Sequence, residues 1–248
     1  MMYYHFAYIY DYLMKEAPYD DWVKFLNQSA LKYGNGGKRV LDLACGTGEI
    51  SYRLAQLGYQ VTGVDLSEDM LVVAKEKMEK FGYFHTPFFK QDMRELNGFH
   101  PFDQIFICCD SLNYLLQEED VYKTFQQVYK HLNEGGLFIF DVHSVYKMET
   151  IFKGETFADN NEDISYIWNC FDGPYEYSVI HELTFFVKEG EHYVRYDEDH
   201  EQRTFPISEY KKMLTSCGFQ IVEVSTGLVQ LPLDKAERIF FIAKKSSK

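Results

Sequence analysis

The stretch of sequence that decides the fold is Val40-Leu41-Asp42-Leu43-Ala44-Cys45-Gly46-Thr47-Gly48-Glu49. Its first half is a short apolar run of the kind that forms a buried strand. The run enters a turn in which Gly46 and Gly48 allow the backbone to bend tightly and to approach a ligand closely. A helical pattern follows from Glu49 to Leu57, so the N–H groups at the helix start point toward the turn. Alone, this pattern is equally typical of a plain strand-to-helix connection.

Helical and strand-like segments alternate outward from this turn. A helical region precedes it at 3–33, and further strands are expected at 59–66, 84–91, 102–109 and 137–142. Between the strands, apolar residues recur at helical spacing, as at Leu71, Ala74, Met78 and Phe81. This alternation predicts a parallel sheet with helices on both of its faces.

The pattern changes after the fifth strand. From Glu155 to Phe205 apolar and polar residues alternate, and Glu189-Gly190-Glu191 predicts a turn between two strands. We therefore expect an antiparallel sheet to be inserted here. The chain closes with a helix that opens at Ser208 and with strands at 219–226 and 238–244.

Charge and composition narrow the classes of function. The 248 residues carry a net charge of −13, and 46% are hydrophobic, which suffices for a core without disulfides. A surface of this charge repels a phosphate backbone, so no nucleic acid partner is expected. The one Lys-rich stretch, 244–248, is expected to be a frayed tail.

The cysteines and the N-terminal residues indicate the cellular compartment in which the protein is expected. The five cysteines are odd in number and form no C-x-x-C pair, so neither a disulfide framework nor a metal site is expected. Residues 1–5 lack the basic region of a secretory signal, and no apolar run reaches the ~18 residues of a membrane span. We therefore expect a cytoplasmic protein with no membrane contact. The oligomeric state stays open, with a homodimer among the alternatives.

Carboxylates at the ends of successive strands point to a ligand. Asp65 ends the second strand 17 residues past the second glycine of the turn, where an acid can accept hydrogen bonds from both ribose hydroxyls. Asp92 follows the third strand and could accept a hydrogen bond from an adenine amino group. Because strand ends at one edge of a parallel sheet converge on one crevice, these acids should share a pocket.

The residues around the turn distinguish between adenosine ligands. Asp42 and Glu49 flank it, and two carboxylates repel a pyrophosphate but suit a cation. Ser51 stands where the dinucleotide fingerprint has its third glycine. Charge and spacing therefore favour S-adenosylmethionine, whose sulfonium and ammonium groups are positive, over a dinucleotide.

Three motifs resemble those of the class I S-adenosylmethionine-dependent methyltransferases: Asp42-x-Ala44-Cys45-Gly46-Thr47-Gly48, Val61 to Leu71, and Gln91-Asp92-Met93-Arg94. Phe102-Asp103 and residues 132–136 match the same pattern, so the resemblance covers residues 38–142. It implies the Rossmann-like α/β fold of that family, a doubly wound, mostly parallel, seven-stranded sheet. N-terminal helices and an antiparallel β insertion complete the expected fold.

Individual roles follow from the resemblance. The residues expected to bind the cofactor are Tyr10, Asp42, Ala44, Gly46, Gly48, Asp65, Leu66, Met70, Asp92, Met93 and Asp110. The resemblance places Asp42 and the two glycines against the methionine part and Asp65 against the ribose. It places Asp92 and the Met93 N–H against the adenine, and Asp110 beside the reacting methyl group.

The chain is more narrowly similar to small-molecule N-methyltransferases with a β insertion after the fifth strand, including those that act on amino sugars. They share the N-terminal Tyr10-Asp11 pair over the cofactor and a segment like 111–115, in which Tyr114 stands where some carry His. The implied division is a helical cap (1–37), a cofactor-binding domain (38–148 and 206–248) and an antiparallel insertion over the acceptor pocket (149–205).

Methyl transfer by in-line displacement depends more on orientation than on covalent help from the protein. A base is needed only if the nucleophile arrives protonated. His143 could be that base, could bind the acceptor, or could be a structural residue bonded to backbone. Tyr114 could orient the acceptor or simply pack. Core or solvated positions are expected for Trp168, His181 and His200, and a solvated edge for residues 197–201.

The sequence thus predicts an S-adenosylmethionine-dependent methyltransferase that acts on a small-molecule acceptor, with amines among the candidates. Two rival functions stay open at this point. One is a nicotinamide-dependent oxidoreductase, which would bind NAD in place of S-adenosylmethionine. The other is a non-catalytic regulator, which would bind S-adenosylmethionine without turnover.

Overall fold

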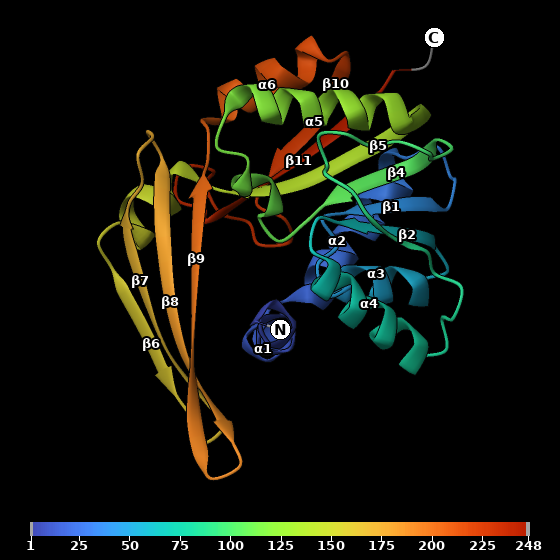
Figure 1. The fold of residues 1–248 in the computed structure, drawn as a ribbon. Helices are drawn as coiled ribbons and strands as arrows, with labels where there is room; N and C mark the ends of the chain where they lie inside the picture. The colour runs from blue at the N-terminus through green and yellow to red at the C-terminus, as the bar shows by residue number, and fades with distance from the viewer. Residues whose placement is uncertain (1, 247–248) are drawn as a thin grey trace.

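The computed structural model describes residues 2–246, so the expected domain ends at residue 1 and at 247–248 lie outside the described residues. Its larger sheet has seven strands in the order β10-β11-β5-β4-β1-β2-β3 (Figure 1). These strands are β1 (Arg39–Leu43), β2 (Gln60–Asp65), β3 (Phe88–Lys90), β4 (Phe102–Ile107), β5 (Leu132–His143), β10 (Phe219–Ser225) and β11 (Arg238–Lys245). The first five pair in parallel, and β11 runs antiparallel to both of its neighbours. The expected mostly parallel seven-stranded sheet is confirmed.

Helices cover both faces of this sheet. They are α1 (Met2–Leu13), α2 (Tyr19–Tyr33), α3 (Glu49–Gln56), α4 (Glu68–Lys80), α5 (Glu118–His131) and α6 (Ile207–Ser216), with short helices η1 (Met14–Glu16), η2 (Ser111–Tyr114) and η3 (Lys147–Phe152). Because successive strand residues point to opposite faces, Val40 and Leu41 of β1 enter different cores. Leu41 packs in the core that holds Phe125 of α5, and Val40 in the core that holds Leu54 of α3.

A second sheet stands beside the first and is entirely antiparallel (Figure 1). Its strands, in spatial order, are β6 (Thr156–Asn160), β7 (Ile164–Asp172), β8 (Ser178–Glu189) and β9 (His192–Arg203). Helix α1 lies between this sheet and α4: Ile9 packs with Ile164 and Phe185, and Lys77 of α4 pairs with Asp11 at 2.6 Å. The expected antiparallel insertion and N-terminal helices are therefore present.

Two local expectations are wrong. The third strand was expected at 84–91 but is only Phe88–Lys90, since Pro87 has no N–H for a ladder and Phe84 is exposed. The last strand was expected to end at Lys244, where a frayed tail would begin, yet β11 continues through Lys245. The ammonium groups of Lys244 and Lys245 bind backbone carbonyls at the ends of α2 and α5, where the last carbonyls of a helix favour positive charge.

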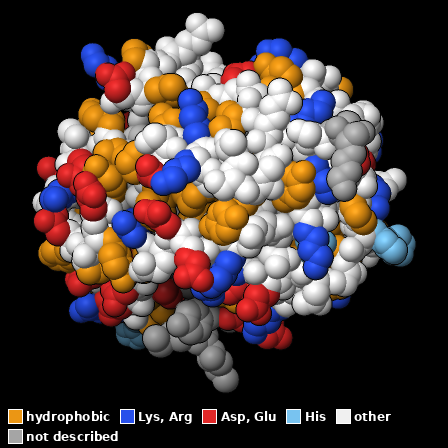
Figure 2. Space-filling model, turned by 90° about the horizontal axis from the view of Figure 1, so that it is seen from above, with side chains coloured by type: hydrophobic (Ala, Val, Ile, Leu, Met, Phe, Trp, Pro, Cys, Tyr) orange, Lys and Arg blue, Asp and Glu red, His pale blue; other side chains and the backbone are white. Residues whose placement is uncertain are grey.

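The surface and the helix lengths add two observations. On the face seen from above, Lys and Arg side chains are scattered and do not gather in one basic patch (Figure 2). Within residues 2–246, no helix combines the length and the apolar character needed to cross a membrane.

Candidate active site

One large cavity, of about 1250 Å³, lies between the carboxyl edge of the first sheet, α1 and the inner face of the second sheet. Eleven of the residues that the sequence singles out line it: Tyr10, Ala44, Gly46, Asp65, Leu66, Met70, Asp92, Met93, Asp110, Tyr114 and His143. Asp42 and Gly48 are not part of its wall. The strand ends therefore do converge on one crevice, and the second sheet closes the crevice from the opposite side.

The glycine turn is held by Asp65. Gly46 has a φ of 52°, and its N–H donates to Asp65 Oδ2 at 2.7 Å, while the Ser67 N–H donates to Oδ1 at 2.8 Å. Gly48 has a φ of 78°, and a Cβ atom there would come within 3.0 Å of the Ala74 side chain. Both glycines thus adopt the left-handed conformation that side chains disfavour, and Gly48 also allows α3 to lie close to α4.

Asp42 lies behind the turn. Its side chain is 1% exposed, and Ser51 Oγ donates to Asp42 Oδ2 at 2.6 Å. Burial raises the pKa of Asp42 to about 7, although the Ser51 hydrogen bond opposes the shift. Ser51, which takes the place of a third glycine in the sequence, therefore supplies the partner that this buried carboxyl needs.

Asp92 enters the cavity as one half of an ion pair that the sequence analysis missed. Arg94 Nη2 lies 2.6 Å from Asp92 Oδ2, and the Arg94 backbone N–H donates to Oδ1. Arg94 also pairs with Asp120 of α5 at 3.0 Å. Hydrogen bonds from Arg94 are the main reason that the pKa of Asp92 is lowered, although partial burial opposes them.

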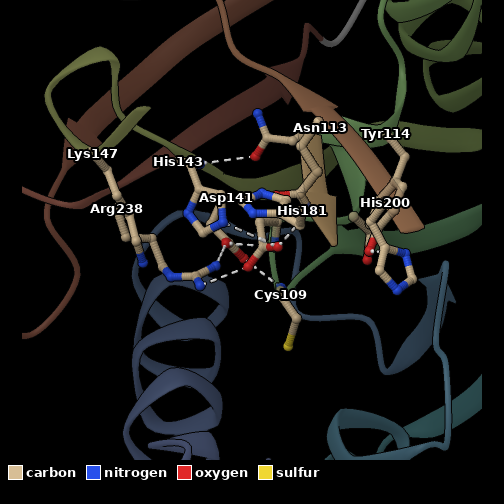
Figure 3. Close-up of polar contacts among 12 residues, drawn as sticks. Cys109, Asn113, Tyr114, Asp141, His143, Lys147, His181, His200 and Arg238 are labelled. Carbon is tan, nitrogen blue, oxygen red and sulfur yellow. Dashed lines mark hydrogen bonds and ion pairs between the residues drawn. The ribbon is translucent and has the colours of Figure 1, made fainter. Parts of the chain in front are cut away.

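Asp110 is the centre of a largely buried polar network. Figure 3 labels Asp141, His143 and Arg238, which belong to this network. Its Oδ1 lies 2.7 Å from Arg238 Nη2, and its Oδ2 lies 3.3 Å from His143 Nε2 and accepts from Gln202 Nε2 at 3.0 Å. Burial alone would raise the pKa of Asp110, but His143 and Arg238 bring it well below the usual range. Arg238 also binds Asp141. These contacts join β4, β5, β11 and the second sheet at one carboxylate.

His143 is buried at the end of β5. Burial lowers its pKa, so the ring favours the neutral form at neutral pH although Asp110 opposes this shift. A neutral ring that donates from Nε2 to Asp110 leaves Nδ1 as an acceptor, and this buried atom has no hydrogen-bond partner among the side chains described, those of residues 7–246. Asn113 fixes the strand end, because it accepts from the His143 N–H at 2.9 Å and donates to the Arg203 carbonyl at 2.8 Å.

The second sheet supplies a wall over the expected acceptor side, but the sequence analysis did not assign its individual residues. The cavity-lining residues of its inner face are Tyr166, Trp168, His181, Leu183, Phe185, Glu198, His200 and Gln202. Trp168 Nε1 donates to His181 Nδ1 at 3.0 Å, and burial lowers the pKa of His181 to about 4. Tyr114, 48% exposed, lies 3.3 Å from His200 Nδ1 through its hydroxyl (Figure 3).

Expectations for the insertion need correction accordingly. Trp168, His181 and His200 were expected in a core or in solvent, but they face the cavity. The expected solvated edge at 197–201 holds only in part. Asp197 and Asp199 are exposed, whereas Glu198 and His200 alternate with them and line the cavity.

Charge along the cavity wall is mostly negative. The carboxyl-bearing lining residues are Glu49, Asp65, Glu68, Asp69, Asp92, Asp110, Asp120 and Glu198, and the basic ones are Lys90, Arg94, Lys147 and Arg238. Each of the four basic side chains already lies within 4 Å of a carboxylate. The wall therefore suits a cation such as S-adenosylmethionine and is unfavourable to the pyrophosphate of a nicotinamide cofactor.

Comparisons of the sequence with known proteins all point to methyltransferases. A sequence model described as the methyltransferase domain matches residues 40–136. YqeM of Bacillus subtilis (strain 168), which is named as a methyltransferase, is 51% identical over 250 residues that cover 99% of this chain and 98% of that protein. The match thus extends over the second sheet as well as the first.

Solved structures share the whole fold. The crystal structure of an S-adenosylmethionine-dependent methyltransferase from Clostridium acetobutylicum ATCC 824 is 31% identical, with a TM-score of 0.89 and 100% of both chains covered. The sugar N-methyltransferase KedS8 from Streptoalloteichus sp ATCC 53650 shares the fold at 19% identity, with a TM-score of 0.82 over 97% of this chain and 93% of that one. Identity over the full length and a common fold together show that this chain belongs to the class I S-adenosylmethionine-dependent methyltransferases.

Proposed function

We propose that this methyltransferase acts on a small-molecule acceptor, which binds between the rim of the first sheet and the inner face of the second. The observation that carries the proposal is the single continuous cavity. Ligand pockets commonly measure about 300–1,000 Å³. At about 1250 Å³, this cavity exceeds what one such ligand needs, so it has room for the cofactor and for a small acceptor beside it.

The cofactor half of the proposal assigns roles to the rim. Asp65 would accept from the ribose hydroxyls, because each of its oxygens accepts one backbone N–H and retains capacity for a second donor. Asp92 and the Met93 N–H would face the adenine. The methionine part would lie along Ala44 and Gly46, with Asp42 acting from behind the turn. Tyr10, Leu66 and Met70 complete the surrounding wall.

The acceptor half assigns roles to the residues near Asp110. The bound cofactor supplies an electrophilic methyl group on a sulfonium. Asp110 and Asn113 hold His143 in place at the cavity wall, where its ring could take a proton from an acceptor that arrives protonated. Tyr114, with its hydroxyl beside His200, would orient the acceptor. Orientation of this kind can lower a barrier by roughly 7–11 kcal/mol.

We also propose the division of labour along the chain. Residues 1–37 cap the cavity, 38–148 and 206–248 bind the cofactor, and 149–205 roof the acceptor side. The support is that α1 lies between α4 and the second sheet, while the inner face of the second sheet turns eight side chains toward the cavity.

The test uses S-adenosylmethionine with a labelled methyl group. Incubation with the protein and a bacterial extract should place the label in low-molecular-weight products, and calorimetry should show binding of S-adenosylmethionine but not of NAD. Label found only in protein or RNA would contradict the small-molecule acceptor.

A further inference from the structure

Glu198 occupies a distinctive place on the acceptor wall. The strands of the second sheet align Trp168, Leu183 and Glu198 in one row across the inner face, and the next row holds His181 and His200. Glu198 is half-buried and lines the cavity, while its neighbours Asp197 and Asp199 are exposed. It is the one carboxylate that the second sheet turns into the cavity among the described residues.

Although the backbone of Glu198 pairs with β8, its carboxylate has no hydrogen-bond or ion-pair partner among the described residues. The cations that line the cavity are already paired with other carboxylates. Arg238 is bound to Asp110 and Asp141, and Lys147 lies 3.4 Å from Glu237. The three cavity histidines do not compensate either, because burial lowers the pKa of each of them. The protein therefore leaves one negative group of its acceptor wall without a counter-charge.

Aromatic residues line the cavity together with this carboxylate. Trp168 shares its row, and Tyr166 and Tyr114 line the same cavity. Tyr114 is near enough that Glu198, after burial and other carboxylates, contributes to raising the pKa of Tyr114. The faces of aromatic rings attract cations, and so does an unpaired carboxylate in a cavity whose lining is mostly acidic. We propose that Glu198 is a specificity-determining residue that binds a positively charged group of the methyl acceptor.

The position of Glu198 also indicates where the positively charged group of the acceptor lies in the cavity. Gln202, which contacts Asp110, lies four residues farther along β9, or roughly 13 Å at the usual rise of a strand. The cationic group is therefore separate from the atom that receives the methyl group near Asp110. The acceptor has a nucleophile at one end and an ammonium-like cation at the other. This inference rests on the proposed function, since it concerns the acceptor half of the same cavity.

The test compares two probes of the same shape and different charge. Choline is a quaternary cation that cannot be methylated at nitrogen, and 3,3-dimethylbutan-1-ol replaces that nitrogen with carbon. Calorimetry is performed on the full chain saturated with S-adenosylhomocysteine, so that the cofactor half is occupied. We expect choline to bind roughly tenfold more tightly than the neutral alcohol. Glu198→Gln should abolish this preference.

Glu182→Gln is the matched control, because Glu182 is exposed on the outer face of the same sheet. It should retain the preference for choline. Equal binding of the two probes, or no binding of choline, overturns the inference. It is also overturned if Glu198→Gln weakens the binding of S-adenosylhomocysteine, because Glu198 would then belong to the cofactor half. Methyl transfer to low-molecular-weight products, measured in parallel, reports on the proposed function whatever choline does.

Discussion

The two walls of the cavity are built in different ways. On the first sheet, the candidate acids stand at or shortly after the end of a strand, as Asp65 does at the end of β2 and Asp110 after β4. On the second sheet, functional residues lie in the middle of long strands and form rows across them, as His181 and His200 do. The residues of the first wall can therefore be located from short sequence motifs. Those of the second wall can be located only once the pairing of the strands is known.

The walls also differ in charge. Seven of the eight cavity carboxylates belong to the first sheet, its loops and its helices, while the second sheet contributes neutral imidazoles, aromatic rings and Glu198. The two meet at Asp110, which binds Arg238 from β11 and Gln202 from β9. We therefore expect substitutions on the first wall to change the affinity for the cofactor and substitutions on the second wall to change the choice of acceptor. At Asp110 and its partners, where the two walls meet, one substitution should affect both.

Arg238→Met should have the largest effect, because it breaks the junction itself. Arg238 neutralises both Asp110 and Asp141, and Asp141 is 2% exposed. Removing one partner of a buried ion pair leaves uncompensated charge and costs about 3–5 kcal/mol. Urea unfolding should show this loss in the free energy of unfolding. Arg238→Lys, which keeps a positive charge, should lose less, and equal losses in both variants would show that charge is not the cause.

The first wall could be predicted from the sequence, and the second could not. Each strand of a parallel sheet ends at the same edge, so the order of motifs along the chain was enough to bring Asp65, Asp92 and Asp110 into one cavity. In the insertion, a shift of register by one residue exchanges the two faces of a strand. Without the register, neither His181 nor Glu198 could be assigned to the inner face.

Partners that come from distant segments were also missed. Arg238 begins β11 opposite His143, the last residue of β5, but only the antiparallel pairing of these strands reveals this. An arginine directly before the apolar run 239–243 was the available signal, since a buried cation requires a carboxylate partner. For Asp42 the motif could be recognised from the sequence, but its position could not. Its carboxyl lies behind the turn, where it accepts a hydrogen bond from Ser51.

Asp65→Ala tests the first wall by itself. We expect S-adenosylmethionine binding to weaken by about 1–3 kcal/mol through lost hydrogen bonds, measured by calorimetry. Asp69→Ala is the matched control, because Asp69 lines the same part of the cavity. An equal loss in both variants would mean that negative charge in general, and not the ribose contact, binds the cofactor. The affinity for choline should be the same in both variants as in the wild type, because choline is expected to bind at Glu198 on the second wall.

His181→Asn tests the second wall through pH. Because burial lowers the pKa of His181 to about 4, from 6.5, the unfolded chain binds more protons than the folded protein between these values. The wild-type protein therefore loses stability as pH falls from 6.5 toward 4, by about 3 kcal/mol from this group. The stability advantage of the wild type over His181→Asn should shrink across this window in urea unfolding. A constant advantage would show that His181 titrates normally.

Asp11→Asn should have the smallest effect, and it examines the element that touches both walls. Asp11 of α1 accepts from Thr47 in the glycine turn and pairs with Lys77 at 2.6 Å, while Ile9, on the same helix, packs against the second sheet. Both charged side chains are partly exposed, so the loss should be about 0.5–1 kcal/mol.

This loss should appear as faster hydrogen exchange in residues 7–13 with little change in global stability, because local opening of α1 leaves the two cores intact. Asp21→Asn, an exposed acid in the first turn of α2, is the control and should leave this exchange unchanged. If exchange in α1 does not respond to Asp11→Asn, the contact of Ile9 with the second sheet holds the helix by itself. Helix α1 would then be held mainly by the second sheet. Opening of the cavity for the cofactor would in that case require α1 to separate from the second sheet as well as from the glycine turn.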